Sequence, residues 1–140
     1  MAANTLPIYT RLGDVQWTTT PMTALNATTD LTTGTIYLAF TADATEGGYV
    51  QRIRFKAVLS TNTATVARVW LNNGLTTATA ANNVLIDEIS LPTATASSTA
   101  ALPVYELPLN FAMPPGYTIY ITLGTAVTGG WKASVIGGKY

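Results

Sequence analysis

Short runs in which apolar and polar residues alternate recur along the chain, and this period of two residues is typical of β-strands. The alternation is clearest over residues 49–59, where large apolar residues take one face and three basic residues the other. Clusters of Gly, Pro, Asn and Thr separate the runs, as expected of turns. The pattern predicts eight strands, at residues 14–18, 35–40, 49–59, 63–71, 84–91, 104–109, 117–123 and 131–136.

The number and spacing of these strands predict the fold class. Eight short strands without a 3.6-residue pattern are typical of an all-β sandwich or barrel, and eight favours a jelly roll. We therefore predict a single-domain antiparallel β-sandwich, jelly-roll-like, at residues 21–140, after an extended N-terminal arm at residues 1–20. One sequence does not reveal strand order, so an immunoglobulin-like sandwich stays open.

Prolines and low-complexity tracts refine this picture. Pro103 and Pro108 place strand 104–109 at a sheet edge or beside bulges, because proline cannot donate a hydrogen bond to a ladder. Residues 76–81 and 93–101 are rich in Thr, Ala and Ser, and their alanines alone would permit a helix. We expect exposed loops instead, because β-branched Thr is frequent and no apolar stripe is present.

Composition narrows the possible functions. The chain has 140 residues, the size of one domain, with no Cys, no His, 10% charged residues and a net charge of zero. The commonest metal ligands and general base are thus missing, and attraction to nucleic acid or a membrane surface is not expected. We predict no cofactor and no metal. A neutral surface rich in hydroxyl groups is weakly protected against self-association, which favours a homo-oligomer.

The carboxylates offer few candidates for catalysis or metal binding. Asp87 and Glu88 are adjacent, so on a strand they point to opposite faces. An enzyme would need two carboxylates in a cleft, for instance Glu106 with Asp87. Asp43 and Glu46 could ligate calcium, but a solvated loop is the simpler interpretation. We expect a protein that is not an enzyme.

Basic and aromatic residues suggest a contact surface. Successive members of the row Arg52, Arg54 and Lys56 lie about 7 Å apart on a strand and could meet an acidic protein, or they could form a solvated face that blocks edge pairing. The aromatic residues could form a sugar-stacking platform, although most aromatics in small sandwiches are core. The predicted interface residues are Tyr9, Arg11, Arg52, Arg54, Lys56, Tyr120, Trp131 and Tyr140, with Trp131 and Tyr140 as the anchors.

Two segments near the C-terminus carry a family resemblance. Residues 109–117 hold the turn Pro114-Pro115-Gly116, and residues 130–140 place Trp131 between glycine pairs. With these segments the chain resembles small structural proteins of tailed-bacteriophage virions, and it looks like their capsid decoration, or cement, proteins.

The resemblance implies a cofactor-free β-sandwich, made in the host cytoplasm, that binds the major capsid protein on the outside of the head and stabilises the shell. It also implies a symmetric homo-oligomer, with a trimer favoured. The N-terminal arm would add a strand to a neighbouring subunit, so removing residues 1–12 should weaken particle binding. The alternative is a host-recognition or carbohydrate-binding module of a tail fibre, which rests on fold analogy.

Overall fold

The structure is a computed structural model that describes residues 10–58 and 60–140. No helix in these residues has the length and apolar character needed to cross a membrane. The described elements are β1 (Leu12–Trp17), β2 (Tyr37–Thr41), β3 (Gly48–Ala57), β4 (Thr65–Asn72), the 3₁₀ turn η1 (Ala80–Asn82), β5 (Asn83–Leu91), β6 (Tyr105–Met113), β7 (Thr118–Leu123) and β8 (Trp131–Lys139).

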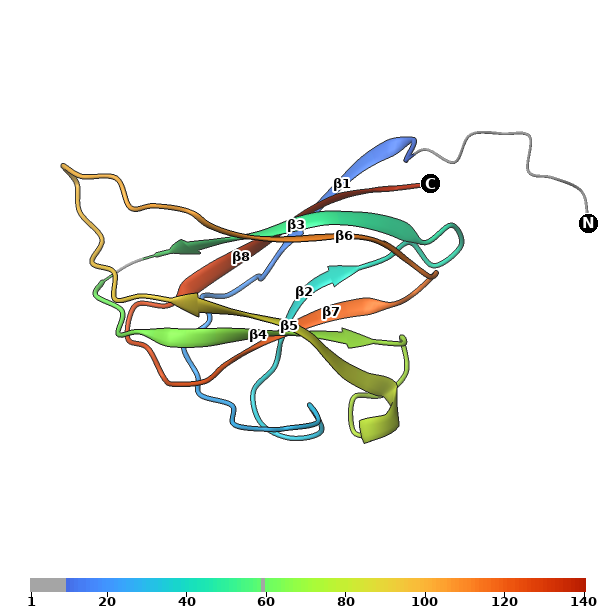
Figure 1. Cartoon of the computed structure of the whole chain (residues 1–140), viewed down its shortest axis with the longest axis horizontal. Coiled ribbons are helices and arrows are strands. Elements are labelled where there is room, and N and C mark those ends of the chain that lie inside the picture. Colours follow the sequence, from blue (N-terminus) through green and yellow to red (C-terminus); the bar gives the residue numbers. More distant parts are fainter. Residues whose placement is uncertain (1–9, 59) are drawn as a thin grey trace, which may run out of the picture.

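The strands pair from the two ends of the chain inward: β1 pairs with β8, β2 with β7, β3 with β6 and β4 with β5. Pairings of β3 with β8 and of β4 with β7 complete two antiparallel sheets. The first sheet has the order β1-β8-β3-β6 and the second has the order β2-β7-β4-β5 (Figure 1). This rolled-up ribbon of strand pairs is the jelly-roll arrangement, so the predicted sandwich is confirmed and the strand order separates it from an immunoglobulin-like sandwich.

One prediction about local structure needs correction. Residues 12–17 are a paired strand of the first sheet, which agrees with the strand predicted at 14–18 but not with a free arm over this part of residues 1–20; residues 1–9 lie outside the described residues. The tracts 76–81 and 93–101 lie in loops, as predicted: the first is mostly exposed and runs into the 3₁₀ turn η1, and the second is exposed apart from Ala94, which bridges Asn62. The edge position predicted from Pro108 is confirmed, because β6 is the last strand of the first sheet and its register shifts beside this proline.

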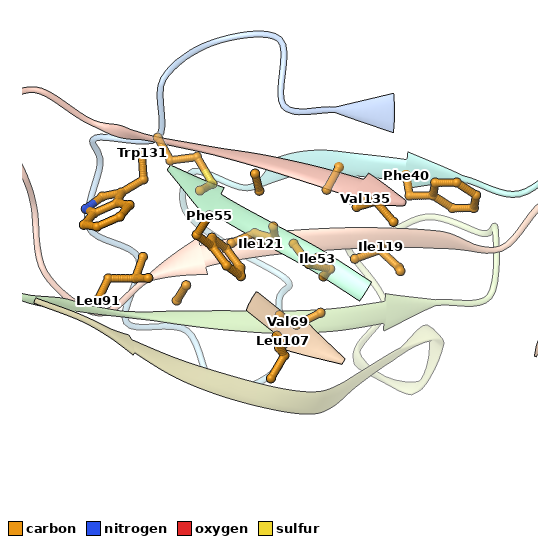
Figure 2. Close-up of a cluster of buried hydrophobic side chains, with 14 of the residues drawn as sticks. Phe40, Ile53, Phe55, Val69, Leu91, Leu107, Ile119, Ile121, Trp131 and Val135 are labelled. Carbon is orange, nitrogen blue, oxygen red and sulfur yellow. The ribbon is translucent and has the colours of Figure 1, made fainter. Parts of the chain in front are cut away.

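The core lies between the inner faces of the two sheets, where apolar residues from both interleave (Figure 2). Trp131 has 0% of its surface exposed and packs edge-on against Tyr105, with ring centroids 5.7 Å apart. Its partner in register is the small Ala57, which leaves room for the indole. The prediction of Trp131 as an interface anchor is therefore wrong: within this chain the ring is a core residue, because β8 turns it to the inner face.

Candidate interface site

Strand β1 carries a concentration of exposed apolar side chains. Leu12, Val15 and Trp17 have 57%, 51% and 58% of their surface exposed, and they are three of the eight large apolar residues exposed in residues 10–58 and 60–140. Single exposed apolar residues are normal, but several on one short strand mark a contact surface. We take β1 and its surroundings as the candidate site.

By alternation Leu12 shares the side of β1 that carries the polar residues Asp14 and Gln16, whereas Val15 and Trp17 lie on the opposite side. Gln16 reaches across to the second sheet, where its amide nitrogen donates to the Thr41 carbonyl at 2.8 Å and its oxygen accepts from the Thr41 amide at 2.9 Å. Its amide nitrogen also lies 3.1 Å from Asp14 Oδ1. The Gln16 side chain therefore links β1 to β2 across the two sheets. Val15 and Trp17 lie on the outer face of β1.

Among residues 10–58 and 60–140, β1 is the end strand of its sheet, and no strand pairs with it on the side away from β8. The amide of Thr18 donates to the Ala133 carbonyl at 3.0 Å. Gln16 and Asp14 lie two and four residues before Thr18 in the same β1–β8 register, so their backbone groups also face β8. In an antiparallel ladder the intervening residues direct their N–H and C=O groups the other way. Val15 and Trp17 thus present backbone donors and acceptors next to their exposed side chains, which is what an added strand requires.

A groove of about 310 Å³ runs beside this edge between β1 and β2. Trp17 lines it from β1 and Leu38, 47% exposed, lines it from β2. Hydroxyl-bearing residues 18–20 contribute to the lining. The site therefore combines an indole, a second apolar side chain and an edge strand, features that are common in protein–protein contacts.

The predicted basic row lies on the outer face of the first sheet, as alternation along β3 requires. Glu106 on β6 lies 3.0 Å from Arg54 and 3.5 Å from Arg52, and the Lys56 ammonium group donates to the Leu102 carbonyl. The three cations stay partly exposed beside one carboxylate. The row is thus a positive surface held in place by neighbours within the chain.

The other predicted interface residues are dispersed. Tyr120 is half-buried on the outer face of the second sheet, in register with Leu38 on β2 and Trp70 on β4. Tyr140 is half-buried at the C-terminus, and exposed Arg11 donates to its carbonyl oxygen at 3.1 Å. Tyr9 lies outside the described residues. The structure does not bring these residues into one patch with the basic row.

The carboxylates are also dispersed. Asp87 lies on β5 at the edge of the second sheet, whereas Glu106 lies on β6 at the edge of the first sheet and is held by two arginines. In residues 10–58 and 60–140, no group of three or more His, Cys, Asp or Glu side chains is placed to hold a metal ion.

The loop between β2 and β3 is tied by its own carboxylates. Asp43 Oδ1 accepts from the amides of Glu46 and Thr45, both at 2.9 Å, and Arg11 forms an ion pair with Glu46. These amide donors, together with Lys139, lower the pKa of Asp43 below its ordinary value. The oxygens considered for calcium are engaged by cations and amides of the chain itself.

Asp30 gives a prediction for acid stability. Its carboxylate accepts from the Thr32 hydroxyl and amide and from the Thr28 hydroxyl, and these bonds lower its pKa. Because its pKa is lowered in the folded state, the carboxylate stabilises the fold at pH values above its ordinary pKa. This stabilisation is lost as the pH falls through the folded-state pKa. We therefore expect Asp30→Asn to flatten the decline of the unfolding free energy below about pH 4, as measured by urea unfolding over a pH series. An unchanged slope would contradict this role of Asp30.

Trp17 is missing from the predicted interface residues, although it is one of the aromatics considered for a sugar-stacking platform. Alternation over residues 14–18 groups Val15 with Trp17, but it does not say whether their shared face points inward or outward. The polar character of Asp14 and Gln16, which usually marks a solvent face, is used here to bridge the two sheets.

Comparison with protein-family models, with curated proteins and with solved structures finds no significant match to this chain.

Proposed function

We propose that the protein is a non-enzymatic structural component of a tailed-bacteriophage virion, a capsid decoration protein that binds the outside of the head and stabilises the shell. The observation that carries the proposal is the β1 edge, where the exposed indole of Trp17 stands on a strand that, among the described strands, pairs on one side only. The resemblance of residues 109–117 and 130–140 to virion proteins supports the particle as partner. Binding would take place at the virion surface after synthesis in the host cytoplasm.

The contact would use the β1 edge in two ways. A segment of the major capsid protein would pair with the backbone of Val15 and Trp17, which extends the first sheet by one strand. The same segment would cover Trp17 and Leu38 along the groove. Burial of an indole in the centre of an interface is among the largest single contributions to binding.

Stabilisation of the shell follows from linkage. A protein that binds the assembled shell and not the free subunits stabilises the shell by RT ln(1 + [L]/Kd) at each site. Because the sites repeat over the lattice, a modest affinity per copy adds up over the particle. The zero net charge of the chain lets many copies crowd together without long-range repulsion.

Particle binding tests the proposal. Purified protein is mixed with phage heads that lack it, the heads are pelleted, and bound copies are counted on a quantitative gel. The proposal expects saturable binding with a copy number that matches lattice positions. Absence of saturable binding to the heads would contradict it.

The Trp17 groove also favours one alternative, a carbohydrate-binding module of a tail. A flat indole beside hydroxyl groups and an amide can stack on a sugar ring. Trp70 and Trp131 are buried and add nothing to such a platform, which leaves a single exposed tryptophan in the described part of the chain. Binding to a glycan array, lost in Trp17→Ala and accompanied by no binding to heads, would favour this alternative.

A further inference from the structure

The outer face of the first sheet carries four basic side chains. Along β3 and β8 the buried residues alternate with exposed or partly exposed ones, which lie on the outer face. We call this surface the cationic face, and its basic members are Arg52, Arg54, Lys56 and Lys132. Lys132 on β8 is in register with Lys56 on β3, so the cations of the two neighbouring strands lie side by side.

The charges of the chain are divided unequally between this face and the rest of the surface. Four of the seven basic residues lie on the cationic face, and of the seven acidic residues Glu106 is the one that pairs with it. All fourteen charged side chains belong to residues 10–58 and 60–140. The face therefore carries a net charge of +3 in a chain whose net charge is zero. Such a local excess attracts an acidic partner.

The basic side chains are held in place by the chain itself and keep donors for a partner. One carboxylate, that of Glu106, serves both Arg52 and Arg54, at 3.5 and 3.0 Å. A guanidinium group has five N–H donors, so a single carboxylate does not satisfy two of them. The buried Nε of Arg52 has no acceptor among the described residues. Lys56 and Lys132 donate to backbone carbonyl groups, which leave their charges uncompensated.

The cationic face continues into the β1 edge. Trp17 is in register with Ser134 on β8, and Ser134 is in register with Arg54 on β3. The indole and the guanidinium group thus belong to one row across the sheet, two strand spacings or about 10 Å apart. The small Ser134 between them lines a shallow hollow of about 360 Å³, to which Val15 and Lys56 also contribute. A segment that covers Trp17 therefore lies next to the cations.

We propose that the part of the major capsid protein that binds the β1 edge carries carboxylates that lie over the cationic face. The inference rests on the proposed function and specifies the chemistry of the partner: an apolar side chain for Trp17, and acidic side chains for Arg54 and Lys56. In this arrangement the acidic segment runs across the first sheet beside the strand that is added to β1.

Charge and apolar surface select this occupant. A second copy that used the same face would set two surfaces of net charge +3 against each other, which is unfavourable. Val15 and Ile136 line the hollow beside the cations. These aliphatic side chains favour a protein segment over an acidic sugar, because a protein segment has apolar side chains to bury against them.

Two matched ion pairs make a controlled test possible. Nε of Arg54 lies 3.0 Å from Glu106 on the first sheet, and Nε of Arg68 lies 2.8 Å from Glu88 on the second sheet. The test variants are Arg54→Gln and Glu106→Gln, and their controls are Arg68→Gln and Glu88→Gln, which change the net charge of the chain by the same amounts. Heads that lack the protein are titrated with each chain at low and at high salt, and bound copies are counted after pelleting. Thermal unfolding checks that each variant is folded.

We expect wild-type binding to weaken at high salt, because salt screens the attraction. At low salt, Arg54→Gln should raise the Kd by about 3-fold or more, because it removes an attractive charge. Glu106→Gln should lower the Kd by about 3-fold, because it removes the carboxylate that repels those of the partner. Both controls should stay within about 2-fold of wild type, because their charges lie on the other sheet.

The outcomes separate this inference from decoration itself. Wild-type binding that is insensitive to salt, or equal Kd values for Arg54→Gln and Arg68→Gln, overturns the acidic partner and leaves decoration standing. A Glu106→Gln chain that binds more weakly than wild type also overturns it. Absence of wild-type binding overturns decoration and this inference together. Self-association in sedimentation velocity, or binding to acidic glycans, that Arg54→Gln weakens while head binding is unchanged assigns the face to a second copy or a sugar, and so overturns the inference.

Discussion

Replacing Trp131 with Ala is expected to lower the free energy of unfolding by about 3–5 kcal/mol, the range for removing a large aromatic side chain from a core. The indole is fully buried and packs against Tyr105, so its loss leaves a cavity between the sheets (Figure 2). The backbone of Trp131 also exchanges two hydrogen bonds with Met22, at 2.8 and 3.1 Å, and these hold the segment after β1 across the end of the sandwich. Loss of the indole packing would therefore also weaken the attachment of the segment that contains Met22.

A milder variant separates packing from hydrogen bonding. The indole Nε1 of Trp131 is buried without an acceptor among the described residues, so Trp131→Phe removes an unpaired donor while it keeps an aromatic ring. We expect Trp131→Phe to lose clearly less stability than Trp131→Ala. Urea unfolding measures both, with Trp17→Ala as a surface control that should change stability by less than about 0.5 kcal/mol. A loss below about 1 kcal/mol for Trp131→Ala would mean that the indole is not a core residue.

The fold could be predicted because strand patterns are local. Alternation along β3 and β8 reflects one buried face and one solvated face, and turn residues separate the strands. Pro108 marked an edge strand correctly, because the missing N–H is a property of the residue itself. Strand order is set by contacts far apart in sequence, and for this reason it had to come from the structure.

The candidate site could not be predicted, and the two tryptophans show why. In β8, Trp131 alternates with Lys132 and Ser134, and its ring is buried although it was predicted to be an interface anchor. In β1, Trp17 alternates with Gln16 and Thr18 in the same way, and yet it is exposed. The difference is that the Gln16 amide bonds to the backbone of Thr41 in the other sheet, a contact between residues 25 positions apart that alternation does not report.

The predicted row of basic residues was correct as a pattern but incomplete as an interface. Its members line one strand face, as the period of two requires. Glu106, which neutralises part of the row, comes from β6 and reaches it through strand pairing. Only the folded chain places this carboxylate beside the row.

Replacing Trp17 with Ala is expected to weaken binding to phage heads by about 2–4 kcal/mol, or roughly 30- to 900-fold in Kd. Covering the exposed part of an indole removes on the order of 150 Å² of apolar surface from water, which stabilises a complex by roughly 3–4 kcal/mol. Because Trp17 contributes little to the core, the variant should fold as the wild type does. The loss would thus appear in binding and not in stability.

The most direct test is a titration of heads that lack the protein with wild type, Trp17→Ala and the control Leu75→Ala, with bound copies counted after pelleting. Leu75 is the matched control because it is 64% exposed and lies in the β4–β5 connection, away from the β1 edge. The account predicts saturable binding for wild type and Leu75→Ala, and a Kd at least about 30-fold higher for Trp17→Ala. Equal binding of all three proteins would contradict the β1 edge as the contact, and no binding by any of them would contradict decoration itself.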